Sequence, residues 1–125
     1  MTRHAGDVVP FERPLTPTEH DLTKWMLLHG RPDAQAYLPQ LTNATVASQC
    51  PCGCASIDFK IRGQRAPVTA LEILGDYLFG GPDDLAGAFV FACGGVLAGL
   101  EVYGLARDHP KELPHPTSLR LFAPG

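Results

Sequence analysis

The hydrophobic pattern of the chain first becomes regular after Thr16, where it follows the 3.6-residue period of a helix. Thr16, Pro17 and Glu19 fit a capping box, with Thr16 as the N-cap and Pro17 at the first helical position. Gly30 supplies a stop signal. We therefore predict a helix over residues 17–29. Within it, helical spacing separates Leu22, Trp25, Met26 and His29, and we expect the Leu, Trp and Met side chains to lie in the core.

Two less regular segments flank this helix. Residues 1–14 mix Pro, Gly and charged residues without a period, so we expect an irregular N-terminal arm in front of a single domain over residues 15–125. After the helix, Ala34, Tyr37 and Leu38 share one side of a short helical pattern over residues 33–38. Pro39 is expected to end this second helix, because proline lacks the N–H of a helix interior.

From residue 43 onwards apolar side chains alternate with polar ones, which is typical of strands. Residues 45–50 and 54–61 are predicted to form a hairpin around a three-residue loop, 51–53. Pro51 and Gly53 suit a type I turn that is closed by a glycine in the left-handed region. This register pairs Cys50 with Cys54 and Ala47 with Ile57.

The same register sorts the second strand of this hairpin into two faces. The face expected in the core holds Ala55, Ile57, Phe59 and Ile61. The other face holds Cys54, Ser56, Asp58 and Lys60. We therefore expect Cys50 and Cys54 on the wetter side of the sheet.

A second hairpin is predicted around Gly94 and Gly95, which suit a two-residue turn of the primed type. Its strands are residues 88–93 and 96–104. The expected cross-strand pairs are Cys93–Val96, Phe91–Ala98 and Phe89–Leu100. The face with these pairs is apolar, and the reverse face is polar only at Glu101 and Tyr103. When a hairpin is apolar on both faces, either the chain itself covers both of them or one face meets a partner. Glu101 and Tyr103, at the rim of the reverse face, therefore mark a candidate binding surface.

The remaining segments complete the predicted fold. Residues 68–79 fit either a helix or a strand, and we favour a strand because it leads into the Gly-rich loop 80–84. The proline-rich tail from His109 is expected to dock in extended form through Leu119, Leu121 and Phe122. Together these elements predict an α+β domain, in which an N-terminal helix packs on a four- or five-stranded antiparallel sheet built from hairpins.

Composition and charge narrow the classes of function. The chain has 125 residues, 45% hydrophobic and 18% charged, with a formal net charge of −3. Because it has no basic stripe to neutralise phosphates, we do not expect nucleic acid as a partner. No uninterrupted apolar run approaches about 18 residues, and the first residues carry no targeting pattern. We therefore expect a cytoplasmic protein without a membrane partner, in which the four cysteines stay reduced.

The candidate chemistry lies in Cys50, Cys52 and Cys54, which place three sulfurs within five residues on or beside a turn. Thiolates bind zinc and copper(I), so zinc is the candidate cofactor and these three residues are the candidate metal ligands. Structural zinc sites usually draw two Cys pairs from separate loops, and here the fourth ligand would be a His, an Asp or a water. Three interpretations remain open: packing thiols, a metal–thiolate site, or a redox pair. Cys93 is expected to fill the core of the second hairpin.

The sequence assigns no catalytic residue. None of the five His residues has a spacing that places it beside Cys52, as a Cys–His nucleophile requires. Asp83 and Asp84 follow Gly-Gly-Pro and suit a turn or an N-cap. The chain also has no serine elbow, no H-E-x-x-H motif and no phosphate loop. An enzyme is therefore less expected than a binding protein.

Several fragments resemble a group of small bacterial proteins of about this length, for which no activity is established. They are RPLT at residues 13–16, LPQL at 38–41, CGCASID at 52–58, GLEVY at 99–103 and ELP at 112–114. The resemblance implies a bacterial source and a self-contained domain, and it carries over no functional residue.

Two hypotheses for function follow from these patterns. In the first, a small non-enzymatic domain acts through a binding or self-association surface on its sheet, as a homodimer or with a protein partner. In the second, the cysteine turn binds a soft metal, zinc or copper, or acts as a thiol redox switch.

Overall fold

The computed structural model describes residues 12–122, and these fold into one antiparallel sheet with helices on one side. The helical elements are α1 (Pro17–His29), the 3₁₀-helix η1 (Pro32–Tyr37), the short α2 (Leu38–Thr42) and the 3₁₀-helix η2 (Pro116–Ser118). The strands are β1 (Arg13–Pro14), β2 (Ala44–Gln49), β3 (Ile57–Ile61), β4 (Gln64–Arg65), β5 (Leu71–Phe79), β6 (Ala86–Cys93), β7 (Val96–Gly104) and β8 (Arg120–Leu121). Their order is β1-β2-β3-β7-β6-β5-β8, and β4 pairs with β3.

The α+β class and the antiparallel sheet are confirmed, but the sheet is larger than predicted. Within the described residues it has eight strands rather than four or five. The additional strands β1, β4 and β8 have only two residues each, too few for a period to register in the sequence. The last two residues of the expected N-terminal arm, Arg13 and Pro14, form β1 beside β2, and residues 1–11 lie outside the described part.

Helix α1 begins and ends at the predicted residues, because its N-terminal signal is local. The Thr16 hydroxyl accepts the Glu19 N–H at 3.1 Å, and the Thr16 N–H donates to the Glu19 carboxylate at 2.8 Å. Arg13 adds an ion pair to the same carboxylate at 2.8 Å. The capping box thus fixes the start of the helix and ties it to β1.

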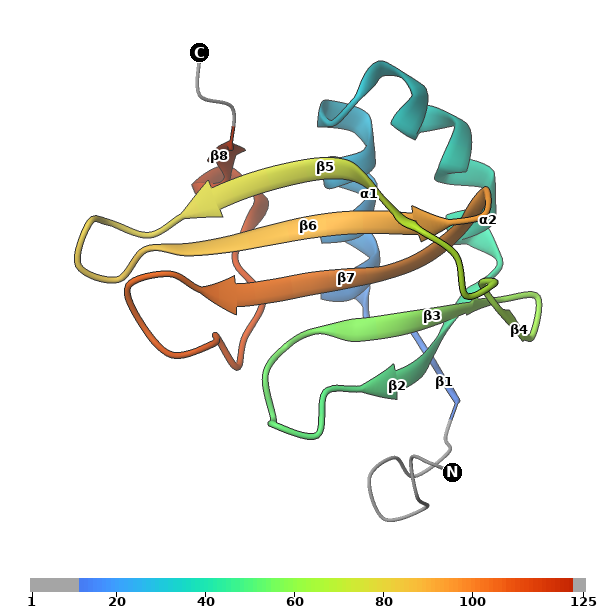
Figure 1. The fold of residues 1–125 in the computed structure, drawn as a ribbon, viewed down its shortest axis with the longest axis horizontal. Helices are drawn as coiled ribbons and strands as arrows, with labels where there is room; N and C mark the ends of the chain where they lie inside the picture. Colours follow the sequence, from blue (N-terminus) through green and yellow to red (C-terminus); the bar gives the residue numbers. More distant parts are fainter. Residues whose placement is uncertain (1–11, 123–125) are drawn as a thin grey trace.

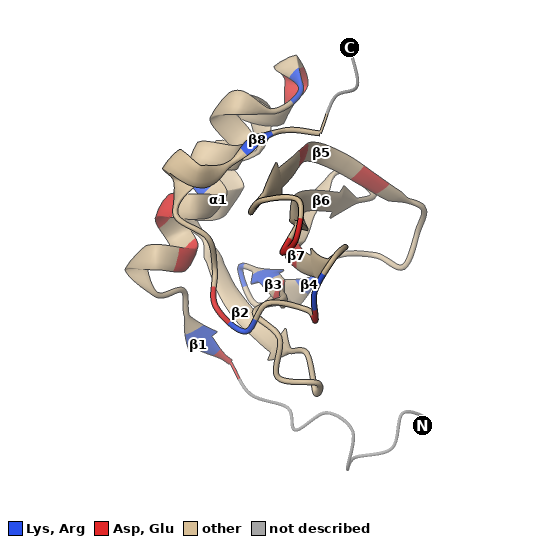
Figure 2. Ribbon diagram, turned by 90° about the vertical axis from the view of Figure 1, so that its left-hand side faces the viewer, with Lys and Arg blue, Asp and Glu red and all other residues tan. Residues whose placement is uncertain are grey.

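One face of α1 is buried against the sheet. Met26 and Leu27 are fully buried, and the hydroxyl of buried Tyr77 on β5 donates to the Met26 carbonyl at 2.6 Å. Figures 1 and 2 show α1 on one side of the sheet, with β5, β6 and β7 curving away from it. The core therefore lies between α1 and the face of the sheet that α1 covers. The helix contributes Leu22, Met26 and Leu27, and the strands contribute Val46, Phe59, Leu74, Tyr77, Val90, Leu97, Leu100 and Val102.

The segment after α1 differs from the prediction. Residues 32–37 form the 3₁₀-helix η1, and α2 then starts at Leu38. Pro39 lies in the first turn of α2 and does not end a helix, because the first helical positions need no N–H donor. From α2, the Gln40 side chain accepts the Leu97 N–H at 2.7 Å and donates to the Gly95 carbonyl at 3.0 Å. Gln40 thereby binds the short helix to the end of the β6–β7 hairpin.

The β6–β7 hairpin has the predicted turn but a different register beyond it. Gly94 and Gly95 both have positive φ, +58° and +78°, and Cys93 pairs with Val96 as predicted. Ala98 then forms a bulge, so Phe91 pairs with Gly99 and Phe89 with Glu101; the predicted pairs Phe91–Ala98 and Phe89–Leu100 are wrong. The bulge shifts the alternation of β7 by one residue.

As a result, the faces of this hairpin differ from the prediction. The buried side chains are Ala88, Val90, Ala92, Leu97, Leu100 and Val102. These side chains belong to the same buried cluster as Leu22, Met26 and Leu27 of α1. Phe89 and Phe91 instead share the opposite face with Glu101 and Tyr103, where Phe89 lies 6.0 Å from Tyr103 between ring centroids.

The structure also settles the two ambiguous segments. Residues 71–79 form strand β5, as favoured from the sequence. The tail docks as β8, which pairs with β5 through Tyr77–Leu121 and Leu78–Arg120. Leu119 is buried, whereas Leu121 and Phe122 stay exposed.

Candidate functional site

The three clustered cysteines lie in the loop between β2 and β3. Gln49 pairs with Ile57, so the loop spans residues 50–56 and is longer than the predicted three-residue loop 51–53. The predicted pairs Cys50–Cys54 and Ala47–Ile57 are wrong. β2 contains a bulge at Ala47, and the Ala55 N–H donates to the Pro110 carbonyl at 2.9 Å instead of to β2. The C-terminal tail thus draws residues 54–56 out of the ladder.

The tight turn inside this loop follows the sequence signal. The Gly53 N–H donates to the Cys50 carbonyl at 3.1 Å, and Gly53 has φ +90°, as expected for a glycine that closes such a turn. The Cys50 N–H donates to the Ser56 carbonyl at 3.3 Å and closes the base of the loop.

Ser56 connects this loop to β7. Its buried hydroxyl accepts the Val102 N–H at 2.9 Å and donates to the Val102 carbonyl at 3.1 Å. The pairing of β3 with β7 ends at Ile57–Leu100, so the serine hydroxyl replaces the next backbone pair. Sequence reasoning missed Ser56, because its partner is 46 residues away and the segment around it shows no local signal.

The Sγ atoms of Cys50, Cys52 and Cys54 all lie within 4.8 Å of one another. Those of Cys50 and Cys52 are 2.7 Å apart, and the Cys54 N–H donates to the Cys52 sulfur at 3.3 Å. Among the described His, Cys, Asp and Glu residues, these three form the group with ligand atoms close enough for one ion. The structure therefore brings together the three residues that the sequence singled out.

The three thiols differ in exposure. Cys52 is exposed at the tip of the turn, Cys50 is partly exposed, and Cys54 is 7% exposed. The expectation that Cys54 faces the wetter side is wrong, because its segment turns inwards towards Pro110. Cys93 is only partly buried next to the Gly94–Gly95 turn, so the expectation of a core residue is also wrong.

Hydrogen bonds in this cluster shift the pKa values of Cys50 and Cys52 in opposite directions. The hydrogen bond between the Cys50 and Cys52 sulfurs and the one from the Cys54 N–H lower the pKa of the Cys52 thiol. The same bond to Cys52, together with burial, raises the pKa of Cys50 to about 12. Cys52 is therefore the sulfur that most readily becomes a thiolate, the form that binds metals and attacks electrophiles.

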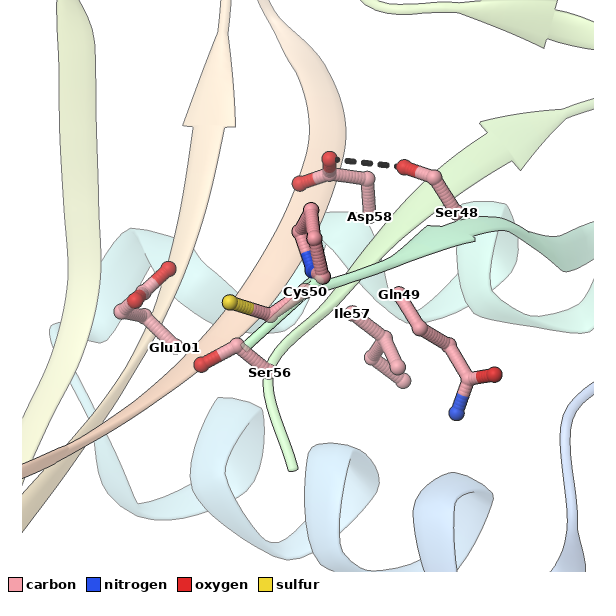
Figure 3. Close-up of a pocket in the computed structure, with 8 residues that line it drawn as sticks. Ser48, Gln49, Cys50, Ser56, Ile57, Asp58 and Glu101 are labelled. Atoms are coloured by element: carbon pink, nitrogen blue, oxygen red, sulfur yellow. Dashed lines mark hydrogen bonds between the residues drawn. The ribbon is translucent and has the colours of Figure 1, made fainter. Parts of the chain in front are cut away.

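A pocket of about 200 Å³ adjoins the turn. In Figure 3 the Cys50 sulfur points from the turn towards Glu101 on β7, with the Ser56 hydroxyl beside it. On the far side, the Ser48 hydroxyl donates to the Asp58 carboxylate at 3.0 Å. Burial raises the pKa of Glu101. The pocket thus combines Cys50 and Glu101, which the sequence assigned to separate sites.

Tyr103, the other residue of the expected binding surface, does not line this pocket. Its ring lies over Gly87, where a Cβ atom would overlap the phenol. Leu71 and Ile73 on β5 are 50% and 38% exposed, and Ile73 pairs with Phe91 of β6. Phe89 and Phe91 on this face are 5.7 Å apart between ring centroids, so the face away from α1 carries a partly exposed apolar patch.

In the view of Figure 2, the Lys and Arg residues of the described part of the chain lie on separate elements. Within residues 12–122, no helix is long and apolar enough to cross a membrane.

Comparison of the chain with family models, with curated proteins and with solved structures finds no match in any of the three. The functional argument therefore depends on the geometry of the site itself.

Proposed function

We propose that the turn formed by Cys50, Cys52 and Cys54 binds a soft metal ion, Zn²⁺ or Cu⁺. The observation that carries this proposal is the mutual distance of the three sulfurs, all within 4.8 Å. Thiolates are preferred ligands of both ions, and three of them from one loop supply most of a coordination sphere.

The geometry requires only a small adjustment for an ion. With Zn–S bonds of about 2.3 Å, tetrahedral sulfurs lie about 3.8 Å apart. Cys50 and Cys52, now 2.7 Å apart, would separate by about 1 Å. Because Cys52 is exposed at the tip of the turn, its side chain can make this movement without disturbing the core.

The coordination sphere would remain open on one side. Three sulfurs satisfy a three-coordinate Cu⁺ ion, whereas Zn²⁺ takes a fourth ligand. The exposed side of Cys52 admits a water at this position. An open position favours exchange of the ion over a purely structural role.

Metal analysis tests the proposal directly. The full chain is purified without added metal, then titrated separately with Zn²⁺ and with Cu⁺ under a reductant, and bound metal is measured by mass spectrometry. We expect one ion per chain in the wild type and in Cys93→Ser, the matched control outside the turn. Cys52→Ser should lose it. Wild-type protein that binds neither ion would contradict the proposal, and the arm that fills first at lower concentration identifies the metal.

A second candidate function is favoured by the apolar patch on the sheet. The domain would associate with itself or with a protein partner through Leu71, Ile73 and Phe91, near Glu101 and Tyr103. Partly exposed apolar residues on neighbouring strands support this candidate, because their burial releases water.

Light scattering over a dilution series measures self-association. A dimer that becomes a monomer on dilution, and that Ile73→Asp weakens, would support the second candidate. A monomer at all concentrations would exclude the homodimer. Val68→Asp is the matched control, because Val68 is fully exposed in the loop before β5.

A further inference from the structure

We propose that Cys52 is an oxidation site for peroxides and that Cys50 resolves it to an intramolecular Cys50–Cys52 disulfide. This inference rests on the same thiols as the proposed metal site and adds a regulation to it. Formation of the disulfide would remove two of the three sulfur ligands and release the ion.

The distance between the two sulfurs supports this pairing. Their separation is 2.7 Å, and a disulfide bond is about 2.05 Å long, so about 0.7 Å of movement joins them. The Cys54 N–H, which donates to the Cys52 sulfur, holds that sulfur within the cluster. Both cysteines lie in the loop outside the β2–β3 ladder, so the bond would form without breaking the pairs of the sheet.

Exposure selects which sulfur reacts first. Cys52 is the exposed thiol of the cluster, whereas Cys54 is buried and its segment is fixed to the C-terminal tail. A peroxide therefore reaches Cys52 from solvent and meets Cys50 as the partly exposed neighbour. Cys93 lies at the end of β6 and is not part of the sulfur group.

The chemistry proceeds in two balanced steps. In the first, the Cys52 sulfur attacks a peroxide oxygen, the O–O bond breaks, and the products are a sulfenic acid on Cys52 and an alcohol, or water from hydrogen peroxide. In the second, the Cys50 sulfur attacks the Cys52 sulfur, the S–S bond forms, and hydroxide leaves with the Cys50 proton as water. The two thiols lose two electrons and the peroxide gains them. A dithiol reductant reverses the change.

Thiol counting on the wild-type chain tests the inference. Reduced protein, treated with a chelator, receives one equivalent of hydrogen peroxide and is then unfolded and alkylated with N-ethylmaleimide. We expect the number of alkylated cysteines to fall from four to two, the four thiols minus the two in the bond. Fragment mass spectrometry should place the link between Cys50 and Cys52. Four alkylated cysteines, or a link to Cys54, Cys93 or a second chain, would overturn the inference.

One variant separates the two steps, and two others serve as controls. In Cys50→Ser, the reaction should stop at a sulfenic acid on Cys52, which dimedone labels. Cys54→Ser and Cys93→Ser should still form the disulfide at the wild-type rate. If Cys54→Ser fails to fold by circular dichroism, the wild-type count and the Cys50→Ser label decide the outcome.

The experiments can reject the oxidation site and the metal site independently of each other. The thiol count is made without metal, so a correct disulfide in a protein that binds no ion would reject only the metal site. Bound metal in a protein whose four thiols survive peroxide would reject only the oxidation site. When both hold, one equivalent of peroxide should release the bound ion, and a dithiol should restore binding.

Discussion

At the scale of single residues, the position of the cysteine turn depends on one serine. Ser56 spans from the loop to β7 through two hydrogen bonds with Val102, both buried. The three sulfurs are close in sequence, but Ser56 and the contact of Ala55 with Pro110 decide how they are presented.

We expect Ser56→Ala to lower the free energy of unfolding by about 2 kcal/mol, because it leaves the buried Val102 N–H without an acceptor. Urea unfolding followed by circular dichroism measures this change. Metal affinity should fall as well, because the turn loses its anchor. Thr69→Ala, at an exposed position, should change stability by less than about 0.5 kcal/mol. Equal effects of the two changes would contradict the role assigned to Ser56.

At the scale of elements, the sequence correctly predicted those elements whose ends depend on neighbouring residues. The capping box of α1 acts over three residues, and the Gly94–Gly95 turn closes between adjacent strands. The bulges at Ala47 and Ala98 had no such signal in the neighbouring residues. The faces of β7 were therefore assigned wrongly from alternation alone.

The start of α1 predicts a pH dependence of stability. Burial acts to raise the pKa of Glu19, but hydrogen bonds from Arg13 and Thr16 outweigh it, so the net change is downward from the ordinary value of 4.5. The folded protein therefore binds this proton less tightly than the unfolded chain. The stabilisation is complete above pH 4.5 and is lost as the pH falls through the lowered pKa.

We expect Glu19→Gln to lower the free energy of unfolding by about 1 kcal/mol at pH 7, because it removes the charge but keeps a hydrogen-bonding side chain. The difference from wild type should disappear at acid pH, where Glu19 is protonated. Urea unfolding at a series of pH values measures both effects. Glu112→Gln, at an exposed position in the tail, should show no such dependence, and a constant difference for Glu19→Gln would reject this explanation.

At the scale of the whole molecule, the strand order assembles the candidate site. β7 lies between β3 and β6 in the sheet, so Glu101 and Val102 come beside the cysteine turn although Val102 is 46 residues from Ser56 in the chain. The tail reaches the same turn through Pro110. The loop is thus held by contacts with β7 and with the C-terminal tail.

Removal of metal should therefore leave the fold intact. We expect a chelator to leave the far-ultraviolet circular dichroism spectrum unchanged. Zn²⁺ at about 100 times its Kd should raise the free energy of unfolding by up to about 2.7 kcal/mol, since the ion binds the folded turn more tightly than the unfolded chain. Thermal unfolding with and without Zn²⁺ measures the shift. Collapse of the spectrum in the chelator would show that the ion is structural instead.

The sequence by itself indicated the α+β class, the helix over residues 17–29 and the glycine turns, because the helix ends and the turns depend on residues near one another in the chain. For residues 68–79 it left helix and strand open and favoured the strand. It also placed three sulfurs within one turn. Only the tertiary structure decided the registers of both hairpins, the burial of Cys54 and the meeting of Cys50 with Glu101. These features depend on contacts between distant parts of the chain, such as the hydrogen bonds across 46 and 55 residues, and no local pattern carries that information.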